Sequence, residues 1–300
     1  MLPLLTASEV SVPFLLAWNF DPVVGIGLAL GVVLYTLALR RARAAGRRTP
    51  PAWQVGAYYA GLFTVALALL GPLDAFNTAS FAIHMLQHLA LIQIAAPLIL
   101  LGRPVQVLLR GVSPRRAGPV VRAVLGRRPV RAVLTVLTHP VAGFLLLNGA
   151  MVLWHLPRFY DAALRNDTIH ELEHLMFFGF ALIFWWAIIE PVPRHHKLPL
   201  PWALTTIFFS GVVATAIGAI LTLASTVIYP FYLHVTNPWG LSPMADQQIA
   251  GLTMWVGGGF LYGGILLGMV VAVLNRQFAD DEDVPAGALP GDAQHLSRPA

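Results

Sequence analysis

Two histidine pairs with the same spacing are the residues of this chain best suited to chemistry. His84 and His88 form one pair, and His170 and His174 form the other. Because residues four apart on a helix project from one face, each pair could present two imidazoles to one cation. His155, which lies between the pairs in the sequence, could complete a site of three or four nitrogen ligands. Imidazole binds copper, zinc, nickel and iron, so the pattern predicts a transition-metal site.

Thioether and carboxylate side chains flank these histidines. Thioether sulfur favours Cu(I), and carboxylates commonly fix the tautomer of a metal-bound imidazole. We therefore expect auxiliary roles for Met85, Met151, Met176, Glu171, Glu173, Asp161, His234 and Asp246, with Gln87 as a further hydrogen-bonding partner. The remaining histidines, His139, His195, His196 and His295, are interpreted as solvated or interfacial. A copper ion of either valence is expected, with zinc as the alternative.

The second pair also fits two other kinds of site. His170-Glu171-Leu172-Glu173-His174 matches the H-E-x-x-H pattern of zinc metalloproteases, in which the first Glu is the general base. The nearest downstream carboxylate, Glu190, lies about 24 Å along the same span, and a protease leaves His84 and His88 without a role. Haem ligation is a third interpretation, but it needs an imidazole on each porphyrin face. With no convincing nucleophile and base, we do not expect an enzyme.

The elements that carry these residues are expected to lie in a membrane. The chain of 300 residues is 57% hydrophobic and 11% charged, whereas soluble proteins carry about 25% charged residues. The absence of cysteine excludes disulfides, cysteine-bound zinc and iron–sulfur clusters. Crossing about 30 Å of hydrocarbon takes around 20 apolar residues. Such stretches occur at 21–39, 53–71, 81–101, 133–155, 171–190, 202–228 and 248–274, and they predict an all-α, multi-pass helical bundle of about seven spans.

One membrane domain accounts for most of the chain. It is expected over residues 21–275, after an outer interfacial segment at 1–20 that lacks the features of a cleaved signal peptide. Residues 276–300 are polar and rich in Pro and Gly, which predicts a disordered cytoplasmic tail. In the last span, Gly259-xxx-Gly263 and Gly264-xxx-Gly268 predict a close helix-packing face.

Basic residues mark one side of the predicted bundle. Of 19 lysines and arginines, all but Arg158 and Arg165 fall in alternate loops or the tail. The positive-inside rule then places the N-terminus outside and the C-terminus in the cytoplasm. Five of the ten histidines therefore share a layer near the outer surface. Basic clusters beside spans attract lipid headgroups, and the aromatic pattern of a single-strand binder is missing, so the expected partner is the lipid bilayer and not nucleic acid.

Four segments carry a resemblance to a known family. The chain resembles the CtaG-type, or caa3-type, cytochrome c oxidase assembly factors of bacteria from about residue 15 to 275, through HMLQH at 84–88, WHLPRFYD at 154–161, HELEH at 170–174 and DQQIAGLTMW at 246–255. Matching positions include all five histidines above, Asp246 and Trp255. Glu173 departs from the apolar residue expected at its place in the motif.

The resemblance implies a seven-span protein of the bacterial plasma membrane that helps to assemble the copper-containing oxidase. A metallochaperone is therefore expected, which takes up copper in its outer His/Met layer and passes it to an oxidase subunit by ligand exchange. Binding requires neutral imidazoles and should weaken below about pH 6. A metal or proton permease that uses the same layer as an entrance is the first alternative, and a membrane zinc metalloprotease is the second.

Overall fold

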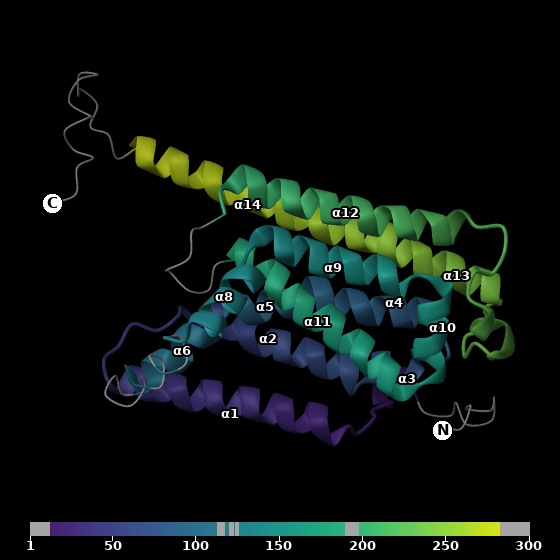
Figure 1. The fold of residues 1–300 in the computed structure, drawn as a ribbon, viewed down its shortest axis with the longest axis horizontal. Helices are drawn as coiled ribbons and strands as arrows, with labels where there is room; N and C mark the ends of the chain where they lie inside the picture. Colours follow the sequence, from purple (N-terminus) through teal and green to yellow (C-terminus); the bar gives the residue numbers. More distant parts are fainter. Residues whose placement is uncertain (1–12, 113–117, 120–122, 124–125, 190–197, 283–300) are drawn as a thin grey trace.

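Helices account for all regular secondary structure in the described part of the chain. The computed structural model describes residues 13–112, 118–119, 123, 126–189 and 198–282, and its long helices lie side by side in one bundle (Figure 1). The expected all-α membrane bundle is confirmed. The first half contains η1 (Phe14–Leu16), α1 (Pro22–Ala44), α2 (Ala52–Leu69), α3 (Pro72–Phe76), α4 (Phe81–Leu89), the π-helical segment η2 (Ala90–Ala95), α5 (Ala96–Leu101) and α6 (Pro104–Gly111).

The second half continues the same pattern of long helices joined by short ones. It contains α8 (Arg128–Leu137), α9 (Pro140–Trp154), α10 (Pro157–Arg165), α11 (Asp167–Ile189), α12 (Leu200–Leu223), η3 (Pro230–His234), α13 (Pro243–Leu252), the π-helical segment η4 (Thr253–Gly257) and α14 (Gly258–Glu282). Among the described residues, 6 helical spans are long and apolar enough to cross a membrane, or 7 if one bent pair counts as a span.

That bent pair is the predicted fourth span. The structure divides the range 133–155 between α8 and α9, which meet at an angle of 64°. A residue before proline avoids the helical conformation, and His139 before Pro140 is extended, with φ −72° and ψ 131°. The His139 ring accepts a hydrogen bond from the Val141 N–H and so caps α9. The predicted span at 133–155 is therefore a bent pair of helices and not one continuous helix.

The helix formed by α4, η2 and α5 lies at the centre of the bundle. In the apolar 18-residue stretch of this span, 67% of the residues are buried, whereas the corresponding share is 11–33% in the other unbroken spans. It packs against α2 on one side, α11 on another and α13 on a third. The Trp185 indole N–H of α11 donates to the Ile92 carbonyl of η2 over 2.8 Å. Residues on α4 are therefore shielded from lipid on several sides, which makes this helix suited to carry polar side chains.

Two glycines allow α12 and α13 to cross closely. A Cβ at Gly218 would lie 2.7 Å from the Gly251 carbonyl oxygen, and a Cβ at Gly251 would lie 2.6 Å from that of Gly218. By contrast, a Cβ at Gly259, Gly263, Gly264 or Gly268 meets no described atom within 4 Å. Within the described chain, the prediction that the later glycines form a close packing face is therefore wrong. The close crossing is at Gly251, nearer to the start of the last span.

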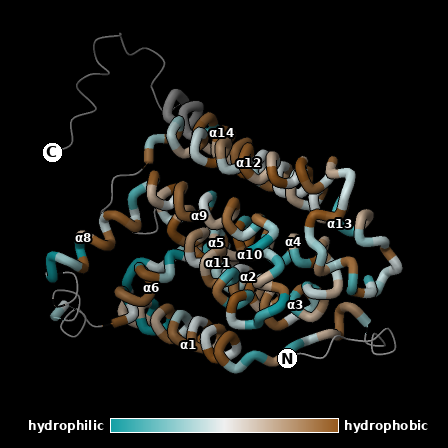
Figure 2. Tube along the Cα trace, turned by 45° about the vertical axis from the view of Figure 1, so that its right-hand side comes forward, coloured by the Kyte–Doolittle hydropathy of each residue, from teal (hydrophilic) through white to brown (hydrophobic). Residues whose placement is uncertain are grey.

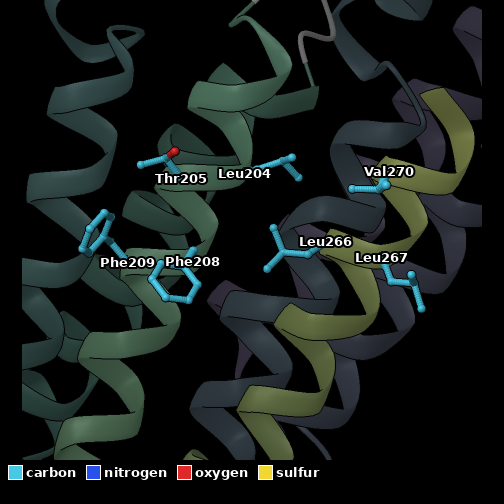
Figure 3. A pocket seen from close by; sticks show the side chains of 7 residues that line it. All are labelled: Leu204, Thr205, Phe208, Phe209, Leu266, Leu267 and Val270. Atoms are coloured by element: carbon cyan, nitrogen blue, oxygen red, sulfur yellow. The ribbon is translucent and has the colours of Figure 1, made fainter. Parts of the chain in front are cut away.

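The outer faces of the bundle are apolar. Along α1, α12 and α14, hydrophobic residues occur throughout the trace (Figure 2), and large ones such as Val23, Phe208 and Phe260 are exposed. Between α12 and α14 lies an open groove whose lining side chains are drawn in Figure 3: Leu204, Thr205, Phe208, Phe209, Leu266, Leu267 and Val270. No lining residue is ionisable, so this surface is suited to hydrocarbon.

Basic residues gather at one end of the bundle. The Arg110 guanidinium donates to the Arg48 carbonyl over 3.0 Å, and Arg47 donates to the carbonyls of Arg110 and Val112. The first and third basic loops therefore adjoin in space. At the same end, α14 extends to Glu282, past the predicted domain end at residue 275. Arg194, His195, His196, Lys197, Arg298 and His295 lie outside the described residues, as does most of the predicted tail.

Candidate metal centre

Four of the predicted histidines face one another between α4 and α11. The ring centroids of His84 and His88 are 4.4 Å apart, and those of His170 and His174 are 4.2 Å apart. Across the two helices, the centroid of His84 lies 5.1 Å from that of His170, and His88 lies 5.5 Å from His174. The spacing of four places each pair on one face of its helix, as helical geometry requires, and the packing of the two helices brings the pairs together.

Glu173 lies at the centre of this cluster. Its side chain is fully buried, with Oε2 3.8 Å from His84 Nε2 and Oε1 3.8 Å from His88 Nε2. Ligand atoms of His84, His170 and Glu173 all lie within 4.8 Å of one another. A single small cation could therefore contact two imidazoles and a carboxylate with only small side-chain movements.

The ring of His155 is oriented by its own helix. His155 follows the last residue of α9, and its Nδ1 lies 2.7 Å from the Met151 carbonyl oxygen. When Nδ1 carries the proton and donates to this carbonyl, Nε2 holds the lone pair that a metal needs. The backbone carbonyl of His155 accepts a hydrogen bond from the Tyr229 hydroxyl over 2.9 Å, which holds the end of α9 in place.

The donor atoms of these residues have no partner among the described residues. The Nε2 atoms of His84, His88, His155, His170 and His174 are buried without a hydrogen bond, and so are both carboxylate oxygens of Glu173. Burying polar groups without partners is costly, and native proteins rarely leave several such groups together. Five imidazole nitrogens and a carboxylate are a donor set for copper or zinc. We therefore find that the residues fit a bound transition metal.

The chain matches the family described as cytochrome c oxidase caa3 assembly factor over residues 33–276. It belongs to that family. The match covers most of the chain and includes every residue of the cluster, so the resemblance carried by the four motifs is confirmed.

Curated relatives of this chain come from mycobacteria. The chain is 31% identical to uncharacterized protein Mb0105 of Mycobacterium bovis over 247 residues. The aligned region covers 80% of this chain and 37% of the relative. It is 29% identical to uncharacterized protein ML1998 of Mycobacterium leprae, over 81% of this chain and 37% of that protein. The chain thus spans just over a third of the length of these relatives. No solved structure matches it.

Three tyrosines without a predicted role pack beside the cluster, with Tyr160 next to His84. The Tyr160 ring lies 5.1 Å from that of His84 and stacks on Tyr229 at 4.0 Å, and its hydroxyl is 3.1 Å from that of Tyr232. Burial raises the pKa of all three hydroxyls above the ordinary tyrosine value, so they remain neutral hydrogen-bonding groups. Aromatic residues in WHLPRFYD and near 229–232 were the only available signal, and such residues are common at membrane interfaces.

Several predicted auxiliary residues lie apart from the cluster. His234 is exposed on η3. His139, which was interpreted as solvated or interfacial and not as an auxiliary residue, is exposed at the start of α9. Asp161 is half-buried, with Oδ2 3.9 Å from Arg165 Nη2. Met176 is half-buried against the apolar core, and Gln87 bonds to Asp74, Asn77 and the Ala68 carbonyl.

Asp246, a predicted auxiliary residue, forms hydrogen bonds with the beginning of α4. Its Oδ1 accepts from the Ser80 hydroxyl at 2.8 Å and the Ala82 N–H at 3.2 Å, and its Oδ2 accepts from the Phe81 N–H at 2.7 Å. A carboxylate at a helix N-terminus satisfies backbone donors and interacts favourably with the helix dipole. Asp246 of α13 thus caps α4 and fixes the helix that presents His84.

The metalloprotease alternative depends on the position of one glutamate. In H-E-x-x-H the general base is the residue after the first histidine, which is Glu171 here. Glu171 is exposed on α11, whereas Glu173 is buried against the imidazoles. The carboxylate beside the imidazoles is therefore Glu173 and not the general base of the motif, so the structure does not favour the zinc-protease interpretation of HELEH, which stays an alternative.

Proposed function

We propose that this caa3 assembly factor takes up a copper ion at the histidine cluster and passes it to a cytochrome c oxidase subunit during assembly. The observation that carries the proposal is the set of five buried imidazole Nε2 atoms without described hydrogen-bond partners, of which those of His84 and His88 lie 3.8 Å from Glu173. Family membership supplies the second support, because the family is described by its role in assembling the oxidase.

The proposal also includes a direction across the plasma membrane. The basic residues around Arg48 and Arg110 lie at the end of α1 and α6, whereas His84 and His170 lie at the beginning of α4 and α11. By the positive-inside rule, the basic end faces the cytoplasm. The cluster then lies near the outer surface, with the N-terminus outside. This is the side from which copper would be collected and handed over.

Ligand exchange is sufficient for the transfer. Cu(I) and Cu(II) both bind imidazole, and a recipient with histidine, cysteine or methionine ligands can replace one donor at a time. Covalent chemistry is not required of this chain, consistent with a family of assembly factors. Zinc is the alternative ion, because a carboxylate and several imidazoles also suit it.

Metal analysis of the full chain purified in detergent tests the proposal. Wild-type protein exposed to copper should retain it through gel filtration, and the variant with His84, His88, His170 and His174 changed to Ala should not. In cells that lack the wild-type gene, the same variant should leave the oxidase without copper. Wild-type protein that retains no copper under reducing or oxidising conditions would contradict the proposal, as would normal oxidase assembly in a deletion strain.

A further inference from the structure

A small cavity adjoins the histidine cluster, further along α4 towards the middle of the span. Its volume is about 30 Å³, and His88 and His155 line it together with Met85, Met151, Met254 and Gln93. A cavity of this size can hold a water molecule or a metal ion but not an organic ligand. His88 is shared by the cavity and the histidine cluster, because its Nε2 also lies 3.8 Å from Glu173 Oε1.

Three thioethers reach this cavity from three separate elements. Met85 is on α4, Met151 is on α9 and Met254 is on η4, and all three side chains are buried. The whole chain has only 7 methionines, so three of them line one cavity that also contains two imidazoles. Methionine is common in cores as an adaptable filler, and its presence alone would carry no conclusion.

Unpaired polar atoms distinguish the cavity from ordinary apolar packing. Gln93 is 6% exposed and its Oε1 has no hydrogen-bond partner among the described residues. The same holds for both ring nitrogens of His88 and for His155 Nε2. These groups line the same cavity as the thioethers. A bound ion or water there would satisfy them, whereas an empty cavity would leave them without partners at a considerable cost.

The two π-helical segments contribute part of this lining. Gln93 lies in η2 and Met254 in η4, and single-turn π segments often occur at functional sites because they redirect side chains. Gly258, which directly follows η4, leaves space for the glutamine amide, since a Cβ there would lie 3.2 Å from Gln93 Nε2. The placement of Gln93 and Met254 thus depends on local backbone geometry at both segments.

We infer that this cavity is a second, thioether-rich subsite that holds copper as Cu(I), with His88 shared between it and the histidine cluster. The inference rests on the proposed function and adds the valence of the ion. Thioether sulfur and imidazole nitrogen favour Cu(I), whereas the cluster around Glu173 supplies the nitrogen and oxygen donors that zinc or Cu(II) also accept. The ion enters already reduced and moves by exchange of ligands at His88, so no electron transfer is involved.

Conservative methionine substitutions test the subsite. Met85→Leu, Met151→Leu and Met254→Leu keep the volume nearly constant and are expected to preserve the fold. Met269→Leu is the matched control, because Met269 is half-buried against the core and does not line the cavity. Full-length protein in detergent would be titrated anaerobically with Cu(I) against bicinchoninate, and separately with Zn(II).

Each cavity variant should lower the affinity for Cu(I) about tenfold or more, by analogy with the loss of other groups around metal sites. Zn(II) binding and the Met269→Leu control should remain at wild-type values. X-ray absorption of the Cu(I)-loaded wild type should show sulfur neighbours, and the triple Leu variant should lose them. Thermal unfolding of each variant identifies any that fail to fold.

The possible outcomes separate the two proposals. Copper bound with only nitrogen or oxygen neighbours, and with the same affinity in the three Leu variants, overturns the thioether subsite but leaves the copper-handling function intact. The cavity would then hold a water molecule. Wild-type protein that binds no copper in either valence overturns both. Loss of Cu(I) affinity in the three Leu variants alone supports the subsite.

Discussion

At the scale of single residues, Glu173 decides the electrostatics of the cluster. An ionised carboxylate buried among neutral imidazoles has no compensating charge, and such burial is strongly unfavourable unless a cation is nearby. Its two oxygens each lie 3.8 Å from an imidazole nitrogen and have no hydrogen bond in the described chain. Burial therefore favours the neutral carboxyl, and a metal ion between Glu173 and the histidines would stabilise the ionised form.

Glu173→Gln is therefore expected to lower copper affinity by about tenfold to a hundredfold, because it removes a negative charge next to the ion. Glu171→Gln changes the same residue type on the exposed face of α11 and should have no effect. A competition titration with a chromogenic chelator measures both. Equal affinities for the two variants would show that Glu173 does not act on the metal.

The sequence predicted the clustering of residues on one helix better than contacts between helices. The spacing of His84 with His88, and of His170 with His174, is enough to place each pair on one face, as the structure shows. That they bind metal stays a prediction. Met254 could not be predicted to line one cavity with Met151, because this depends on helix packing and on a π segment that shifts the register.

At the scale of elements, the hydrogen bonds between Asp246 of α13 and the beginning of α4 fix the position of the helix that carries His84 and His88. Asp246 accepts three hydrogen bonds at the beginning of α4, from the Ser80 hydroxyl and the backbone of Phe81 and Ala82. The sequence drew attention to Asp246 only as an auxiliary residue of the metal site, because a carboxylate that caps a distant helix has the same residue type as one that acts beside a cation. Only the packing of α13 on α4 distinguishes the two roles.

Asp246→Ala should destabilise the protein by about 0.5–2 kcal/mol, the usual effect of removing a cap, and should weaken metal binding through displacement of His84. Asp246→Asn keeps one acceptor oxygen and should be less severe. The thermal unfolding midpoint in detergent measures the first effect, and a copper titration at low temperature measures the second. Weaker copper binding with unchanged thermal stability would instead favour direct ligation by Asp246.

Glycine positions allow a second test at this scale. Gly218→Ala should be destabilising by about 1–3 kcal/mol, because the new methyl group would meet the backbone of α13 and force the helices apart. Gly263→Ala adds the same group in open space on α14 and should be neutral or slightly stabilising. Comparison of the two unfolding midpoints checks the crossing. A similar loss in both variants would mean that α14 is covered by something at Gly263.

At the scale of the whole molecule, the basic end and the histidine end of the bundle are the features that predict its orientation in the membrane. Because the chain has no cysteine, a single introduced thiol reports its own location. Thr236 and Ala45 are both exposed and lie in loops at the histidine end and the basic end, respectively. These two positions therefore form a matched pair.

In intact cells, Thr236→Cys should react with a membrane-impermeant maleimide, and Ala45→Cys should react only after lysis. The positive-inside rule is the reason for this expectation. Labelling is read on a gel after purification. The reverse pattern would place the histidine cluster on the cytoplasmic side and exclude uptake from outside.

A permease would need polar groups that continue past the cavity, whereas α5 consists of Ala-Pro-Leu-Ile-Leu-Leu. Proteoliposomes that contain the chain should therefore take up no more Cu(I) than empty vesicles, although the protein binds the ion. Copper accumulation that exceeds the binding capacity of the inserted protein would support the permease.

The cap that Asp246 places on α4 also sets an order of events during synthesis. Ser80 and Asp246 are separated by 166 positions, so the beginning of α4 lacks this partner until most of the chain has entered the membrane. Met254, eight residues after Asp246, arrives at the same late stage. An incomplete nascent chain therefore has the histidines of α4 and α11 but neither their final alignment nor the third thioether. Under the proposed function, full copper binding therefore requires insertion of the last span.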